Sequence, residues 1–395
     1  MRGDPSADEL AADAPATAQL VERGAYLARA GNCAGCHTQR GGAAYAGGRG
    51  IATPFGTVFA GNLTPDAGSG IGAWSAGDFW RALHNGRSKD GRLLYPAFPY
   101  PNYTQVTRAD ADAIFAFLRS LPAVAQKNRA HELRFPYDQP AALAVWRALY
   151  FWPALFEVQP DKSAAWNRGA YLVRGLGHCV ACHSTRNALG ATSGGLELGG
   201  GLIPLQNWYA PSLAAAAEAG VAGWTDDEVI KLLKTGTSAH GSVLGPMAEV
   251  VYSSTQHLDD ADLSAIAVFL KELPQAEAPA PVTARPEPAT MTRGAAIYKD
   301  RCAACHGEQG QGAAGAYPAL AGSRKLTMAS NTNTVRVIVG GGFPPTTPGN
   351  PRPYGMPPFG QALGNAEVAD VATYVRNAFG NRAPPVSELD VIRAR

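Results

Sequence analysis

Long apolar segments, excess charge and enzyme motifs are all missing from this 395-residue sequence. No run of about 18 or more apolar residues is present, so no segment is expected to span a membrane as a helix. The formal net charge is only +2, which gives no reason to expect nucleic acid as a partner. No Ser-His-Asp set, glycine-rich phosphate loop or nucleotide-binding βαβ signature is found. We therefore expect no substrate site of the chain's own, and whether it is an enzyme stays open.

Cysteine is also scarce, and its six copies all fall in three Cys-x-x-Cys-His motifs. No cysteine is left for a disulfide or for the fourth ligand that a zinc site would need. Two cysteines three positions apart on one helical turn can form thioethers to the two vinyl groups of one haem, and the following histidine can bind its iron. The motifs therefore predict three covalently bound haem c groups rather than zinc or thioredoxin-like chemistry. The predicted attachment residues and iron-binding histidines are Cys33, Cys36 and His37, then Cys179, Cys182 and His183, then Cys302, Cys305 and His306.

A weak internal repeat accompanies the three motifs. Arg23-Gly-Ala-Tyr-Leu, Arg168-Gly-Ala-Tyr-Leu and Arg293-Gly-Ala-Ala-Ile begin nine to eleven residues before the first cysteine of a motif and predict short helices that run into it. Each unit is expected to close with a second helix, marked by apolar residues at helical spacing. These residues are Ile114, Phe117, Leu118 and Leu121, then Leu263, Ile266, Phe269, Leu270 and Leu273, then Val368, Val371, Val375 and Phe379.

Glycine and proline are abundant, at 45 and 30 residues, and favour short helices joined by turn-rich loops that can wrap an apolar cofactor. Two further helices are expected to start with reciprocal caps, in which Ser75 pairs with Asp78 and Thr225 pairs with Glu228. The chain length suggests two to four domains, and the three motifs favour three.

With these features the chain resembles the trihaem cytochrome c subunits of bacterial membrane-associated dehydrogenases, the type that pairs with alcohol, sugar, gluconate or aldehyde dehydrogenases. The resemblance implies an all-α fold of three tandem cytochrome c domains, each wrapping one covalently bound haem. Besides the haem motifs it rests on Thr53-Pro-Phe-Gly56, Gly61-Asn-Leu-Thr-Pro-Asp66, Trp166-Asn-Arg-Gly-Ala-Tyr-Leu172, Gly245-Pro-Met-Ala-Glu249 and Met356-Pro-Pro-Phe359. The expected divisions are a tether (1–17), domain 1 (18–133), an aromatic interdomain segment (134–162), domain 2 (163–274), a Pro-rich linker (275–290), domain 3 (291–383) and a tail (384–395).

The resemblance also implies the function of an electron carrier. The chain would accept electrons one at a time from a large dehydrogenase subunit of the flavin, quinoprotein or molybdenum type, and pass them along its haems to quinone or a terminal oxidase. Two alternatives stay open: a multihaem peroxidase-like enzyme that uses an open haem position in domain 1, and a freestanding electron carrier or oxidase subunit.

A periplasmic location is expected, because bacterial haem c is attached outside the cytoplasmic membrane. The start Met1-Arg-Gly-Asp-Pro does not resemble a signal peptide. We therefore expect that an export signal or an N-terminal anchor has been removed, and that membrane association comes from that anchor or from the partner.

The segment 134–162 has two interpretations. It is rich in apolar and aromatic residues around Pro153, and it can be a helix that joins the first two domains or an exposed contact surface for a partner subunit or the membrane. The residues concerned are Trp146, Leu149, Tyr150, Phe151, Trp152, Leu155 and Phe156.

Methionine commonly supplies the second axial ligand in electron-transfer cytochromes and raises the potential. Met247 and Met356 lie 64 and 50 residues after the proximal histidines of their units, in expected loops before the closing helices, and are the predicted ligands. Met291 and Met328 are expected to be packing residues. By the same resemblance, the proximal imidazoles of the three units should hydrogen-bond to carbonyl groups after the motifs, at Gly61, Pro211 and Pro318.

Domain 1 departs from this pattern. No methionine occurs between Met1 and Met247, and Phe98 stands where the ligand is expected. His84 is the candidate replacement, with Tyr95 or Tyr100 less favoured, and a water-bound or five-coordinate iron is the remaining possibility.

Overall fold

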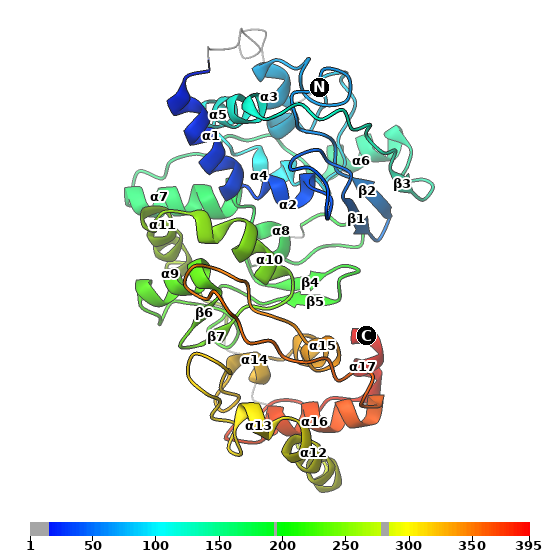
Figure 1. Ribbon diagram of the computed structural model, residues 1–395, viewed down its shortest axis with the longest axis vertical. Helices are drawn as coiled ribbons and strands as arrows, with labels where there is room; N and C mark the ends of the chain where they lie inside the picture. The colour runs from blue at the N-terminus through cyan, green and yellow to red at the C-terminus, as the bar shows by residue number, and fades with distance from the viewer. Residues whose placement is uncertain (1–15, 193–195, 278–283) are drawn as a thin grey trace. The chain divides into compact units, whose positions relative to one another are not determined.

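The structure is a computed structural model that describes residues 16–192, 196–277 and 284–395. It divides into two compact units (Figure 1). Among the described residues, the first unit holds 16–181, 186–192 and Ser253–Phe269, and the second holds 182–185, 196–252 and those from 270 onward. The expected tether 1–17 lies almost wholly outside the described residues, and so does the middle of the expected linker 275–290.

Helices make up most of the regular structure in both units. The helices as far as residue 176 are α1 (Ala18–Ala30), α2 (Cys33–His37), α3 (Ala76–Asn85), α4 (Tyr100–Tyr103), α5 (Arg108–Ser120), α6 (Pro140–Tyr150), α7 (Ala164–Ala170) and η2 (Tyr171–Leu176). The following ones are α8 (Val180–His183), α9 (Asp226–Thr235), α10 (Pro246–Ser253), η3 (Thr255–His257), α11 (Asp260–Lys271), α12 (Pro288–Arg301), α13 (Ala303–His306), α14 (Arg324–Thr327), α15 (Thr332–Gly340), α16 (Asn365–Asn377) and α17 (Glu388–Ala394). Within the described ranges, none is long and apolar enough to cross a membrane.

Among the described residues, three small antiparallel sheets accompany the helices, so the expectation of an all-α fold holds only for the main part of the structure. In the first sheet β2 lies between β1 and β3, with Gly50 opposite Phe59 and Gly56 opposite Leu133. The hairpins occur in the glycine-rich loops that connect the helices. The strands are β1 (Gly50–Thr53), β2 (Gly56–Phe59), β3 (Glu132–Leu133), β4 (Gly201–Ile203), β5 (Trp208–Ala210), β6 (Thr237–Ser238) and β7 (Gly241–Ser242).

The predicted helix starts are confirmed. Ser75 and Asp78 form the reciprocal cap of α3, and Thr225 and Glu228 form that of α9. In each case the hydroxyl accepts from the third amide of the helix, and the carboxylate accepts from the amide of the cap residue, so two otherwise unpaired donors are satisfied.

The first helix of each repeat crosses the closing helix of the same repeat at a glycine. A Cβ atom added to Gly24 in α1 would lie 1.8 Å from the carbonyl oxygen of Ala113 in α5. The corresponding distances are 2.0 Å for Gly169 and Ala265, and 2.4 Å for Gly294 and Asp370. Only a residue without Cβ allows backbones to approach this closely. The glycine of the repeated Arg-Gly-Ala segment therefore sets the crossing of two helices three times.

An ion pair joins the same helices in each repeat. Arg23 contacts Asp110 at 2.5 Å, Arg168 contacts Asp262 at 2.7 Å, and Arg293 contacts Asp370 at 2.6 Å. The arginines are partly exposed, but each carboxylate is about nine-tenths buried. A buried carboxylate is stable only with such partners, so the repeated arginine has a structural role.

The unequal spacing between arginine and cysteine also has a structural explanation. The second repeat has one residue more than the first, and its helix passes from α7 into the π-helical turn η2, which accommodates an inserted residue. The residue before the first cysteine is left-handed in both of these repeats, Asn32 with φ 51° and His178 with φ 43°. The third repeat is shortest, and α12 continues directly to Cys302.

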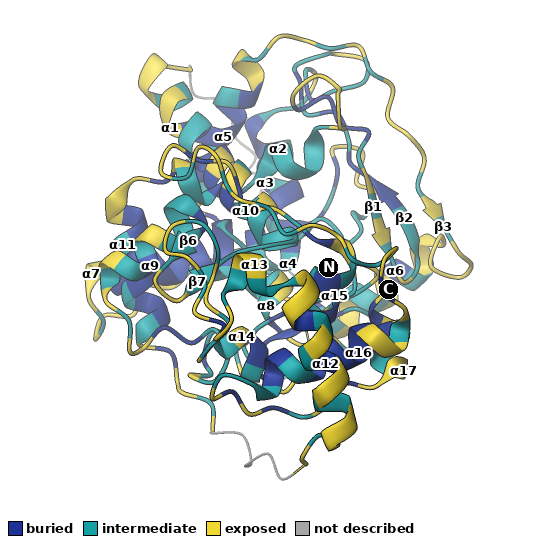
Figure 2. Ribbon diagram, turned by 60° about the horizontal axis from the view of Figure 1, so that its bottom comes forward, coloured by how far each residue is buried: buried dark blue, intermediate teal, exposed yellow. Residues whose placement is uncertain are grey.

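The core of the third repeat is built on α16, which is largely buried (Figure 2). Val368, Val371 and Val375, all predicted as its apolar stripe, belong to this core. Helix α17 packs into the same core through Val391 and lies within the segment expected to be a tail. Its burial ties the end of the chain to the third repeat.

Candidate functional site

The three Cys-x-x-Cys-His motifs all form short helical turns, α2, α8 and α13. In the third motif the amides of Cys305 and His306 both donate to the carbonyl of Cys302, at 3.1 and 2.9 Å. In the first, the amide of Gly35 donates to the carbonyl of Asn32 at 3.0 Å. Such a turn places both cysteines on the same side of the backbone, which is the geometry needed to attach one macrocycle.

Each motif histidine is oriented by a backbone carbonyl, as predicted. The Nδ1 atom lies 2.7 Å from Gly61 O in His37, 2.7 Å from Pro211 O in His183, and 3.0 Å from Pro318 O in His306. A carbonyl can only accept, so Nδ1 must carry the hydrogen. In the neutral ring Nε2 then has the lone pair that binds a metal.

Burial keeps these rings neutral. It lowers the pKa of His37, His183 and His306, although the hydrogen bond to the carbonyl acts in the opposite direction. Neutral imidazole is the form that coordinates iron. The donor set thus fits a haem whose proximal ligand is the motif histidine.

Two of the motif cysteines lie in surroundings that favour the thiol over the thiolate. Burial, together with the neighbouring cysteine of the motif, raises the pKa of Cys33 to about 12 and that of Cys302 to about 11. In the part of the chain that the structure describes, no group of three or more His, Cys, Asp or Glu side chains is arranged to hold a metal ion.

A family model for cytochrome c matches residues 21–122, 167–274 and 291–379, one segment for each motif. The chain belongs to the cytochrome c family. The cytochrome c subunit of alcohol dehydrogenase (quinone) from Gluconacetobacter polyoxogenes is 38% identical and aligns over 98% of this cytochrome and 86% of its own length. The gluconate 2-dehydrogenase cytochrome c subunit of Pantoea cypripedii is 37% identical, over 97% of this chain and 91% of its own length.

One relative is much longer than this cytochrome. A nicotinate dehydrogenase subunit from Pseudomonas putida is 41% identical over 93% of this cytochrome, which spans only 31% of that relative. With one family match around each motif, this cytochrome has three sites for covalently bound haem c.

The predicted methionine ligands lie in different settings. Met356 packs against the hydrophobic core that Cys302 and Ala303 also contact, and its backbone is fixed by two hydrogen bonds with Gly342. Met247, expected in a loop, is in fact in the first turn of α10, because Pro246 can begin a helix. Met328 is buried, as expected for a packing residue.

In the first repeat, aromatic side chains surround Phe98, which stands at the position expected for the second axial ligand. The ring of Phe98 lies 5.4 Å from that of Tyr103, whose hydroxyl donates to the carbonyl of Gly31 just before the first motif. His84, at the end of α3, stacks on Trp80 at 4.7 Å, and its Nδ1 lies 2.8 Å from the carbonyl of Thr104. His84 is thus held against the turn that follows Phe98.

The acidic partners of the repeated arginines were missed by the sequence analysis. Asp110 and Asp262 stand at the start of the closing helices, 87 and 94 residues after their arginines. The signal was present, because each arginine recurs at one position of the repeat, and Asp110 and Asp262 each stand three residues after the residue that caps their helix. The distance along the chain concealed the pairing.

Proposed function

We propose that this cytochrome is the electron-transfer subunit of a periplasmic dehydrogenase complex that oxidises an alcohol, aldehyde or sugar. The observation that carries this proposal is the threefold repetition of a haem-binding turn with an oriented histidine, in a chain that aligns over nearly its whole length with cytochrome c subunits of dehydrogenases. The relatives named above give no support to the peroxidase alternative.

The haem and the residues of each motif would have separate roles in electron transfer. When bound, haem supplies the one-electron iron couple. The two cysteines of each motif hold the macrocycle, the histidine binds iron through Nε2, and the carbonyls of Gly61, Pro211 and Pro318 fix the rings. These carbonyl contacts keep each histidine ring in one orientation.

The second axial ligands are part of the same proposal. Met247 and Met356 supply thioethers in the second and third repeats, and the core contacts of Met356 beside Cys302 support this for the third. The first haem has His84 or no side chain in that position, because Phe98 cannot bind iron. The three domains, with the boundaries 18–133, 163–274 and 291–383, each surround one haem, and electrons leave the chain to quinone or a terminal oxidase.

The aromatic segment 134–162 has two faces, and each fits one of its two interpretations. Phe151 is buried and packs on Tyr100 at 4.7 Å, and the indole of Trp146 donates to the carbonyl of Leu189 at 2.8 Å. By contrast, Leu149, Trp152 and Leu155 are more than half exposed. The exposed face supports a contact surface for the large subunit, and the buried face has a structural role.

Isolation of the native complex tests the function. The cytochrome should copurify with a large dehydrogenase subunit of the flavin, quinoprotein or molybdenum type, and that subunit's substrate should reduce all three haems. Purification of a fully haem-loaded cytochrome alone from its source membranes, with no such subunit in any fraction, would contradict the proposal.

A matched pair of variants tests the contact surface. Trp152→Ser should weaken association with the large subunit and leave the haem spectrum and the stability of the isolated cytochrome unchanged. Trp146→Ser should instead lower stability, because it removes a hydrogen bond and packing. Equal binding by wild type and the Trp152 variant would exclude this face, and binding only to lipid vesicles would assign it to the membrane.

A further inference from the structure

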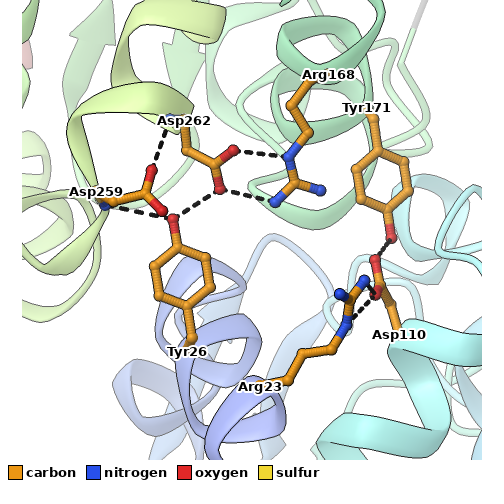
Figure 3. A network of polar contacts seen from close by, with 7 residues as sticks. All are labelled: Arg23, Tyr26, Asp110, Arg168, Tyr171, Asp259 and Asp262. Atoms are coloured by element: carbon orange, nitrogen blue, oxygen red, sulfur yellow. Dashed lines mark hydrogen bonds and ion pairs between the residues drawn. The ribbon is translucent and has the colours of Figure 1, made fainter.

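Two tyrosines of the first unit make reciprocal contacts between the first two repeats (Figure 3). Tyr26 on α1 donates its hydroxyl to Asp262 at the start of α11, at 2.7 Å. Tyr171, at the same position of the second repeat, donates to Asp110 at the start of α5, at 2.6 Å. Each repeat thus gives a tyrosine to the other and receives one from it.

The exchange extends to the helix caps. The hydroxyl of Tyr26 also accepts from the amide of Asp259, and that of Tyr171 from the amide of Thr107, both at 3.3 Å. Asp259 and Thr107 each stand three residues before the aspartate that the tyrosine binds. The four hydrogen bonds of the two tyrosine hydroxyls therefore form two equivalent pairs, in which the first two repeats exchange places. Such a two-fold relation is not expected of chance side-chain contacts.

Each of the two aspartates also has an arginine partner. Besides the tyrosine of the other repeat, each binds the arginine of its own, Arg23 or Arg168. Burial and the bond to Asp262 raise the pKa of Tyr26, and burial and Asp110 raise that of Tyr171, so both hydroxyls keep their protons. A hydrogen bond to an ionised acceptor is stronger than one between neutral groups.

A second reciprocal pair lies beside the haem turns. The side-chain amide of Asn102 donates to the carbonyl of Arg174 at 3.0 Å, and the hydroxyl of Ser254 donates to the carbonyl of Ala30 at 3.1 Å. Both carbonyls are at the ends of the helices that run into a haem motif. The ends of these two helices are therefore held by the repeat to which they do not belong.

The two attachment turns meet at these helix ends. A Cβ atom at Gly31 would lie 3.2 Å from Cδ1 of Leu176 and 3.5 Å from Sγ of Cys33. Tyr103 is buried, donates to the carbonyl of Gly31 at 2.8 Å, and has its ring 5.4 Å from the ring of His178. His178 directly precedes Cys179. Tyr103 and His178 thus connect the turn before Cys33 with the turn before Cys179 by close packing.

The third repeat lacks the hydroxyl needed for this arrangement. Ala296 stands at the position of Tyr26 and Tyr171, and it is exposed. The reciprocal contact is consequently specific to the first two repeats.

We propose that Tyr26 and Tyr171 are positioning residues that hold the attachment turns of the first two repeats together, so that electrons could cross directly between the haems held there, past Tyr103 and His178. One electron passes in each exchange, so one iron is oxidised as the other is reduced, and the tyrosines lose no proton. The inference rests on the haem sites of this chain and is independent of the identity of the dehydrogenase.

The double variant Tyr26→Phe with Tyr171→Phe tests the positioning role in the haem-loaded protein. It keeps the rings and removes both hydroxyls. Haem content and absorbance should not change, while hydrogen exchange of the segments with Thr107 and Asp259 should accelerate by about tenfold for each lost bond to a carboxylate. Electron equilibration between the first two haems, followed after pulse radiolysis, should become slower.

Three further variants make the outcome decisive. Tyr26→Phe alone should affect exchange only at Asp259, which keeps the test valid if the double variant fails to mature. Tyr298→Phe removes a buried hydroxyl that donates to Gly307 in the third repeat, and it should alter neither readout. Tyr103→Leu should slow electron equilibration and leave exchange at Thr107 unchanged. Unchanged exchange and equilibration in the tyrosine variants would overturn the positioning role, and unchanged equilibration in Tyr103→Leu would overturn the path.

Discussion

Replacement of Gly169 by alanine tests the helix crossing on which each repeat is built. In an isolated helix this change stabilises by about 1 kcal/mol, because glycine has more conformational freedom to lose on folding. In this cytochrome the new methyl group would lie 2.0 Å from the carbonyl oxygen of Ala265. The local preference and the tertiary contact therefore predict opposite signs for the change in stability.

The magnitude follows from the displacement required. An ordinary van der Waals contact begins near 3.4 Å, so the two helices must separate by the difference between 2.0 and 3.4 Å, about 1.4 Å. Overpacking of a core costs about 1–3 kcal/mol, and a backbone carbonyl, which cannot rotate away, places this case at the upper end. After subtraction of the gain in helix propensity, we expect a loss of about 2 kcal/mol.

Denaturant unfolding, followed by far-ultraviolet circular dichroism and by haem absorbance, measures this loss. Gly340→Ala is the matched control, since Gly340 also lies in a helix but has open space around its missing Cβ. The control should be neutral or slightly stabilising. Gly24→Ala and Gly294→Ala should behave like Gly169→Ala. A Gly169 variant as stable as the control would refute the close crossing of the helices.

Five other measurements test the haem sites, one ion pair and one buried arginine. Denaturing mass spectrometry of matured protein should give the mass of the chain plus three haems, and a smaller number would contradict the assignment. Phe98→Met should raise the potential of one haem alone, since methionine ligation raises it, whereas His84→Ala should make one haem high-spin in electron paramagnetic resonance if His84 is its ligand. Burial raises the pKa of Asp262, but hydrogen bonds from its arginine and tyrosine partners together lower it more, so the net effect is a lowered pKa. The ionised carboxylate therefore stabilises the fold above the ordinary pKa of 3.8, and this contribution is lost as the pH falls below that value. Asp262→Asn should reduce this acid sensitivity. Arg376 is fully buried and donates to three backbone carbonyls. Arg376→Met should therefore destabilise the third repeat by about 3 kcal/mol in denaturant unfolding. An unchanged unfolding midpoint would show that these hydrogen bonds contribute nothing to stability.

The sequence by itself determined the features that depend on local chemistry. The haem turns, the caps at Ser75 and Thr225 and most of the apolar stripes of the closing helices are encoded within a few residues, so spacing alone identified them. Of the predicted stripe residues, Leu121, Leu273 and Phe379 lie beyond the ends of these helices. The carbonyl partners of the motif histidines were also predictable, because the resemblance to known cytochromes supplied positions that local patterns do not.

Tertiary structure decided what depends on residues far apart in the chain. Arg23 could be recognised as a repeated residue, but its partner Asp110 lies 87 positions away, and nothing local connects them. The two faces of the aromatic segment have the same composition and differ only in what covers them. The exchange of Tyr26 and Tyr171 between repeats is likewise invisible in the sequence, because the same Arg-Gly-Ala-Tyr segment gives no sign that its hydroxyl binds the other repeat. Long-range pairing is selected by the packing of whole helices, and that packing exists only in the folded chain.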